Sequence, residues 1–124
     1  MTRLENAQCI PCKKNSPGIG RAECEQLLVE IPGWKAIDEE GVRRLQKEFS
    51  TKNFATAMAF SNKISDAAES VDHHPSILTE WGKVIVTWWT HSIKGLHIND
   101  FIMAAKTDSL YAAEDIHNRS SKTP

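Results

Sequence analysis

Apolar residues recur at helical spacing in three parts of the chain. The first covers residues 21–31 and stops at Pro32-Gly33, and the last begins after Asn99, a suitable N-cap. Between them lies a longer stretch that follows Asn53 and must end by His74, because proline disfavours the α conformation in the residue before it. One face of this stretch carries Phe54, Ala57, Met58, Ser61, Ile64, Ala68 and Val71. The spacing predicts three helices, each packed on a core by one face.

Four shorter segments between these helices are predicted to form two hairpins. Residues 34–37 and a segment from Val42 flank the turn at residues 38–41, and residues 77–78 and 83–91 flank Gly82. Alternate residues of 83–91 belong to opposite faces of a strand, with Ile85, Thr87, Trp89 and His91 on one face and Val84, Val86, Trp88 and Thr90 on the other. Large side chains on both faces of a strand are expected when one face packs on helices and the other face contacts a partner subunit or lines a pocket.

The resulting order of helix, two strands, helix, two strands and helix predicts an α+β fold. We expect a two-layer sandwich, a four-stranded antiparallel sheet with helices on one face. Residues 21–116 are predicted to form a single domain, between a flexible N-terminal arm at 1–20, which Pro and Gly interrupt, and a frayed tail at 117–124. An apolar open face of the sheet would need a second subunit to cover it.

Charge and hydropathy exclude several classes of function. Fifteen basic and sixteen acidic side chains give a net charge of −1, so no basic excess suggests binding to nucleic acid or an anionic membrane. No apolar run is long enough to span a bilayer, and the first residues lack the apolar stretch of a signal peptide. We therefore expect a cytoplasmic protein.

Three cysteines are present, and Cys9 and Cys12 have the C-x-x-C spacing of redox and zinc sites. A redox motif is expected at the start of a helix that follows a strand, but this pair lies among proline and glycine residues that indicate a loop. A structural zinc site needs four ligands, and Cys24 is the only further thiol. We therefore assign Cys9 and Cys12 no catalytic role.

The side chains best suited to proton transfer lie near the C-terminal end of the long helix. Glu69, Asp72 and His73 lie at i, i+3 and i+4 of its last turn, so their side chains share one side. His74 follows directly, and His91 would reach the same turn only through tertiary folding. Imidazole exchanges protons near neutral pH, and no Ser or Cys nucleophile occurs in this segment. This set suits proton transfer to and from a bound molecule rather than covalent catalysis.

Three other interpretations of the histidines stay open on these residues. A metal-binding, hydrolase-type site could use Glu69, His73 and His91, although no metal-ligand spacing such as H-E-x-x-H is present. The histidines could instead serve as a structural helix terminus, where the dipole favours an imidazolium. The third interpretation is a non-enzymatic dimerisation module, with Ile85, Trp88 and Trp89 at its interface.

The spacing of these residues resembles the signature of the pterin-4a-carbinolamine dehydratase family. The matching pattern is Glu69-x-x-x-His73-His74-Pro75, then Trp81, His91 and Asp100. The likeness extends over roughly residues 21–113 and includes Gly33-Trp34 before the first strand. The Cys9 and Cys12 segment lies outside it.

The resemblance implies the α+β fold and a homodimer or homotetramer in which sheets of two subunits join. It implies dehydration of 4a-hydroxytetrahydropterin to the quinonoid dihydropterin, the step that recycles tetrahydrobiopterin, with no metal and no organic cofactor. His73 and His91 carry over as the acid–base pair, and His74 as a substrate contact. The other residues implied at the pterin site are Glu69, Asp72, Pro75, Trp34 and Asp100. The family also includes a transcriptional coactivator, which we keep as a minor alternative.

Overall fold

The computed structural model describes residues 4, 7–9 and 18–113. Its elements are α1 (Arg21–Leu28), β1 (Lys35–Glu39), β2 (Val42–Ser50), α2 (Phe54–Val71), β3 (Ser76–Glu80), β4 (Lys83–Trp88), a 3-10 helix η2 (His91–Ile93) and α3 (Ile98–Ala113). The four strands form one antiparallel sheet in the order β1-β2-β4-β3. This confirms the predicted α+β fold with the order α-β-β-α-β-β-α.

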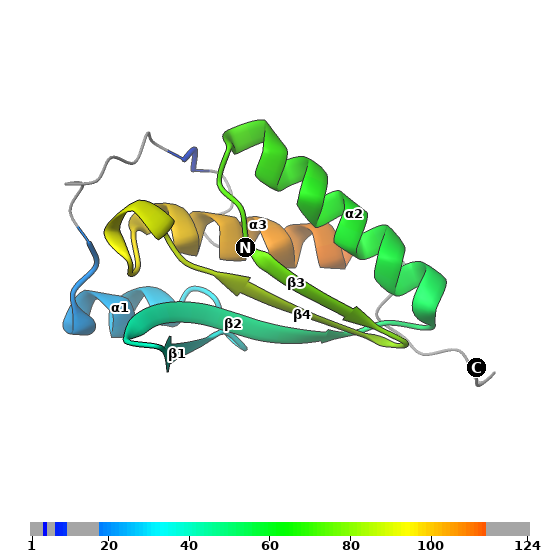
Figure 1. The fold of residues 1–124 in the computed structure, drawn as a ribbon, viewed down its shortest axis with the longest axis horizontal. Helices are drawn as coiled ribbons and strands as arrows, with labels where there is room; N and C mark the ends of the chain where they lie inside the picture. Colours follow the sequence, from blue (N-terminus) through cyan, green and yellow to red (C-terminus); the bar gives the residue numbers. More distant parts are fainter. Residues whose placement is uncertain (1–3, 5–6, 10–17, 114–124) are drawn as a thin grey trace.

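Helices α2 and α3 cover one face of the sheet and contact each other (Figure 1). The sheet contributes alternate residues to the core beneath them, and α1 adds Cys24 and Leu27. The fully buried side chains on this face of the sheet are Leu45, Phe49, Val84, Val86 and Trp88. They share one face because successive side chains of a strand point to opposite faces: Val84, Val86 and Trp88 are every second residue of β4, and Leu45 and Phe49 of β2 flank the half-buried Lys47. The predicted division of residues 84–88 between two faces is therefore confirmed.

Local signals set both ends of α2. The Asn53 side chain accepts a hydrogen bond from the Thr56 backbone N–H at 2.9 Å, and the Thr56 hydroxyl accepts one from the Asn53 N–H at 3.1 Å. At the other end Asp72 adopts a left-handed conformation with φ 52°, and the helix stops at Val71. The predicted cap and the predicted end before His74 are both confirmed.

The expected strand at residues 83–91 is wrong at its end, because β4 stops at Trp88. The last residue pairs of its ladders are Leu45 with Trp88 and Ser76 with Thr87. Strand β2 continues to Val42 in its ladder with β1, but its pairing with β4 ends at Leu45. Thr90 instead pairs with Gly95, and the loop between them contains η2. His91 therefore lies on a loop rather than on a strand. The first strand likewise starts at Lys35, one residue after Trp34.

Several described residues of the predicted N-terminal arm contact the domain. The Leu4 side chain is buried in the core, and the Ile19 N–H donates to the Leu96 carbonyl at 2.8 Å. The predicted tail at 117–124 lies outside the described residues. No helix in the described part of the chain is long and apolar enough to cross a membrane.

Candidate active site

Antiparallel pairing of β3 and β4 brings the histidine-bearing segments to one end of the sheet. Ser76, the first residue of β3, pairs with Thr87 near the end of β4. The residues that precede β3, His73 to Pro75, must therefore lie beside the chain as it leaves β4 toward His91. Two segments that are sixteen residues apart in sequence meet here because of strand register.

His73 is held from two sides in a nearly buried position. Its Nε2 lies 2.7 Å from Oδ1 of Asp100, and its side chain is 11% exposed. The imidazole stacks on the Trp88 indole with ring centroids 5.6 Å apart and an angle of 15° between the planes. Both the position and the tilt of the ring are thus fixed by tertiary contacts.

Asp100 is completely buried and organises this part of the site. Its Oδ2 accepts a hydrogen bond from the Thr90 hydroxyl at 2.7 Å and another from the His97 backbone N–H at 2.9 Å. These donors compensate for the loss of hydration of the carboxylate. Since Oδ2 is engaged twice, Oδ1 remains to accept the Nε2–H of His73. The free nitrogen of His73, the atom able to exchange a proton with a ligand, is then Nδ1.

His97 is a buried part of this network that the sequence pattern did not single out. Its Nδ1 accepts a hydrogen bond from the Asn99 N–H at 3.1 Å, which requires a lone pair on that nitrogen. Burial lowers the pKa of His97, an effect that the negative charge of Asp100 opposes and His73 reinforces. Thr90 was missed as a site residue too. Only its position one residue before His91 could have pointed to it, because its contact with Asp100 is tertiary.

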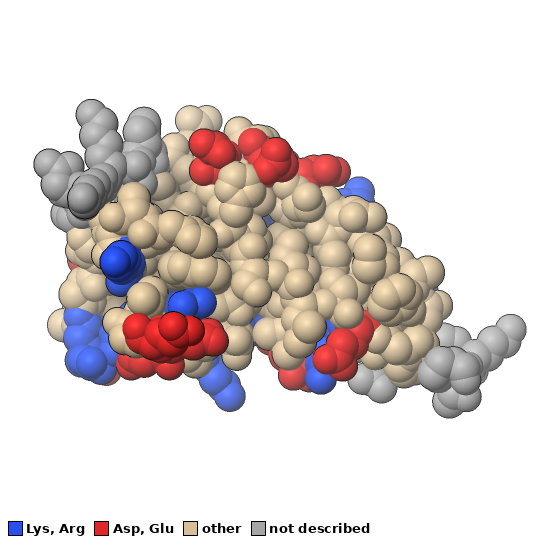
Figure 2. All heavy atoms as spheres, viewed as in Figure 1, with Lys and Arg blue, Asp and Glu red and all other residues tan. Residues whose placement is uncertain are grey.

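His74 and Glu69 form a second, solvent-exposed pair. His74 Nε2 hydrogen-bonds to Oε2 of Glu69, and their side chains are 50% and 71% exposed. Asp72 is exposed at the end of α2, and Pro75 is half-buried. Figure 2 shows acidic side chains gathered along the C-terminal half of α2, the segment that carries Glu69. This negative surface would repel a nucleic acid or another polyanion.

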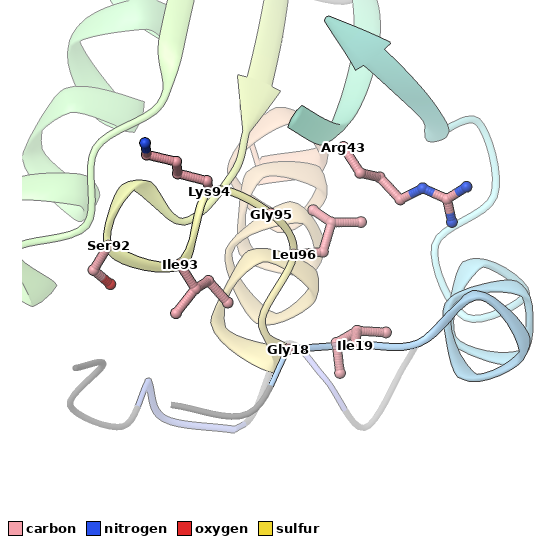
Figure 3. A pocket seen from close by; sticks show the side chains of 8 residues that line it. All are labelled: Gly18, Ile19, Arg43, Ser92, Ile93, Lys94, Gly95 and Leu96. Carbon is pink, nitrogen blue, oxygen red and sulfur yellow. The ribbon is translucent and has the colours of Figure 1, made fainter. Parts of the chain in front are cut away.

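His91 lies exposed at the start of η2. Its ring contacts the Trp89 indole with centroids 4.6 Å apart and a tilt of 35°. The loop that follows borders a cavity of about 550 Å³ (Figure 3). The cavity is lined by Gly18, Ile19, Arg43, Ser92, Ile93, Lys94, Gly95 and Leu96.

Trp34, expected at the pterin site, has its contacts elsewhere. The indole is 5% exposed, and its Nε1 donates to both carboxylate oxygens of Asp108 at 3.1 Å. Asp108 also accepts a hydrogen bond from Lys47 at 2.9 Å. Asp108 follows Asp100 by eight residues on α3, a separation of about 12 Å along the helix axis. The contacts of Trp34 therefore link the sheet to α3 away from His73.

The described residues contain no group of three or more His, Cys, Asp or Glu side chains arranged to hold a metal ion. Cys9 and Cys24 are free thiols, and Cys12 lies outside the described residues. Burial raises the pKa of the Cys9 thiol, with the nearby Lys106 charge acting in the opposite direction. A raised pKa leaves less thiolate at neutral pH, the form that reacts or binds metal.

Comparisons with known proteins agree on one family. The family model described as Pterin 4 alpha carbinolamine dehydratase matches residues 17–110. A Chlorobium luteolum protein named "Putative pterin-4-alpha-carbinolamine dehydratase" is 49% identical over 111 residues, which cover 90% of this chain and 97% of the relative. A crystal structure from Brucella melitensis, described as a transcriptional coactivator/pterin dehydratase, has a TM-score of 0.69 and 30% identity, and the match covers 76% of this chain and 98% of that one. A pterin dehydratase-like protein described as a RuBisCO assembly factor in the alpha-carboxysome matches with a TM-score of 0.55 and 22% identity over 64% and 89% of the two chains, a likeness of fold alone.

Proposed function

Because the chain belongs to the pterin 4 alpha carbinolamine dehydratase family, we propose that it dehydrates 4a-hydroxytetrahydropterin to the quinonoid dihydropterin by histidine acid–base catalysis. In a cell this step would return the oxidised pterin to tetrahydrobiopterin recycling. The observation that best supports the proposal is the hydrogen bond between His73 and the buried Asp100. It orients one imidazole at the end of the sheet where the register gathers His74 and His91.

The reaction needs one proton removed and one proton supplied. Loss of water from the substrate breaks the bond between C4a and its hydroxyl oxygen, and the N5 proton leaves as the C4a–N5 double bond forms. We assign removal of the N5 proton to Nδ1 of His73, because the Asp100 carboxylate then stabilises the imidazolium that results. His91, exposed on its loop, donates a proton to the departing hydroxyl. Exchange with solvent restores both imidazoles after each turnover.

His74 and its neighbours are assigned to substrate binding rather than to proton transfer. The ring of His74 is already engaged with Glu69 at the surface. Asp72 and Pro75 flank the same turn, where they can contact the pterin. We assign Trp34 and Asp100, both expected at the pterin, to other roles, since Asp100 is buried behind His73 and Trp34 binds Asp108.

General acid–base catalysis is worth roughly 10²–10⁴-fold in rate. A carbinolamine loses water without much assistance, so an enhancement of this size is sufficient. The test is the rate at which the purified chain converts a synthetic 4a-hydroxytetrahydropterin, measured against the spontaneous reaction. A rate equal to the spontaneous one would refute the proposed activity.

The assignment of the three histidines is tested by steady-state kinetics of single alanine variants. His73→Ala and His91→Ala should each lower kcat by about 10²-fold or more, whereas His74→Ala should mainly raise KM. The His73/His91 double variant should lose far less than the product of the single effects, because the two act as a unit. Near-native kcat in both single variants, with circular dichroism showing an intact fold, would contradict the assignment.

We also propose that the chain forms a homo-oligomer through its sheet. The face opposite the helices carries Leu78, 49% exposed, directly beside the half-buried Ile85. Strands β1 and β3 are the two edges of the sheet, and an edge strand can pair with that of another subunit. Light scattering should therefore give a multiple of the chain mass at micromolar concentration; a monomer mass would refute this proposal. No observation in the described residues favours a non-enzymatic role.

A further inference from the structure

Among the described residues, the imidazole of His91 has one ring contact, with the indole of Trp89. No hydrogen bond from the His91 ring to another described residue is present, although its backbone carbonyl accepts from the Lys94 N–H at 3.3 Å. The side chain is exposed on a 3-10 turn of three residues. An exposed side chain on a short turn changes rotamer freely unless a neighbour restricts it.

Trp89 is itself held in place by Arg44. The guanidinium carbon of Arg44 lies 4.1 Å from the centroid of the Trp89 ring, a cation–π arrangement. Leu45 pairs with Trp88 in the ladder of β2 and β4, so Arg44 and Trp89 are the next cross-strand neighbours, on the opposite face. Glu39 fixes the other end of the guanidinium, with 3.5 Å between Nη1 and Oε2.

Arg44 is unusual for a residue on the face away from the helices. Its side chain is only 16% exposed, and its Nε is buried with no hydrogen-bond partner in the described part of the chain. The stack on Trp89 and the contact with Glu39 therefore account for its position. A planar cation held in this way stiffens the indole on which His91 rests.

We propose that Arg44 and Trp89 are positioning residues for His91, an inference that rests on the proposed role of His91 in proton transfer. Adjacent residues where the chain leaves β4 then contact the two catalytic imidazoles. Trp88 stacks on His73, and Trp89 contacts His91. Fixing the imidazole before the substrate arrives removes an entropic cost from the chemical step.

Kinetics of four variants test this proposal. Trp89→Ala should lower kcat by roughly 10- to 100-fold with KM changed much less, and Trp89→Phe should restore most of that loss because a ring remains. Arg44→Ala should show a smaller loss of the same kind. The matched control is Arg43→Ala, since Arg43 is the neighbour of Arg44 on β2, points to the other face and lines the cavity of Figure 3.

A spectroscopic measurement separates positioning from stability. The ring current of Trp89 should shift the NMR signals of the His91 ring protons in the wild-type chain. Trp89→Ala should remove that shift, and Arg44→Ala should reduce it while Arg43→Ala leaves it in place. This readout does not need dehydratase activity.

The outcomes distinguish the two proposals. If His91→Ala loses activity but Arg44→Ala and Trp89→Ala keep kcat within about twofold of wild type, positioning is refuted and the proposed function stands. An unchanged His91 spectrum in Trp89→Ala also refutes positioning. If His91→Ala keeps full activity, the proposed role of His91 fails and the positioning role fails with it. Should Trp89→Ala not fold, the kcat and the His91 ring signals of Arg44→Ala decide the matter.

Discussion

Replacing Asp100 by asparagine should change which nitrogen of His73 carries the proton. Asn has nearly the same shape, and its carbonyl oxygen can still accept from Thr90 and the His97 N–H, as Oδ2 of Asp100 does. Its amide nitrogen then takes the place of Oδ1, 2.7 Å from Nε2 of His73, and it donates where the carboxylate accepted. His73 must therefore accept at Nε2 and hold its proton on Nδ1.

The size of the effect depends on what His73 does. If Nδ1 of His73 is the base that takes the N5 proton, it is blocked in Asp100→Asn, and kcat should fall by the full acid–base contribution, roughly 10²–10⁴-fold. If the carboxylate only strengthened a charged imidazolium, the loss would be that of one charge-assisted hydrogen bond. Such a bond contributes about 1.5–3 kcal/mol, or roughly 10- to 150-fold in rate. A fall beyond the second range supports His73 as the base.

The assay is steady-state dehydration of synthetic carbinolamine, with urea unfolding as a check on stability. Asp108→Asn is the matched control, because Asp108 lies on the same helix and binds Trp34 and Lys47 instead. It should cost about 1 kcal/mol of stability, given that Lys47 and Asp108 are partly exposed, and leave kcat unchanged. If Asp100→Asn keeps kcat within about twofold of wild type while remaining folded, Asp100 does not orient a catalytic His73.

Three further predictions follow from other contacts. Burial lowers the folded-state pKa of His97 below its unfolded value of about 6.5, so stability should be full above that pH and fall as the pH drops toward the folded pKa, by at most about 1.4 kcal/mol per pH unit. Urea midpoints measured at several pH values should fall less with decreasing pH in His97→Asn, whose side chain cannot titrate. If the midpoint depends on pH equally in the variant and the wild type, the prediction is contradicted. Trp34→Phe loses the hydrogen bonds to Asp108 and should lower the free energy of unfolding by about 1–2 kcal/mol in the same assay, with kcat and KM unchanged. A raised KM would instead indicate that Trp34 contacts the pterin. Exhaustive chelation should leave dehydratase activity unaltered, and so should serine at Cys9 and Cys12; activity that zinc or iron restored after chelation would argue for a metal site.

Local rules in the sequence determined the order of the main elements and both ends of α2. Asn53 and the proline at position 75 mark the ends of α2 because capping and proline sterics act within a few residues. The alternation along residues 84–88 correctly separated the buried face of β4 from the open one, since side chains of any strand alternate. The signature of spaced histidines and acidic residues identified the family, because such a pattern can be recognised without coordinates.

Contacts between distant segments decided the rest of the candidate site. His91 lies on a loop because the ladders of β4 end at the pairs Leu45–Trp88 and Ser76–Thr87, whose partner residues are far from it in sequence. Asp100 lies behind His73 rather than at the surface, since Thr90 and the His97 N–H reach its other oxygen only after the loop has closed. The residue types and their spacing carry the chemistry of proton transfer. Which groups meet, and from which face of the sheet, depends on strand register and packing, which no short stretch of sequence encodes.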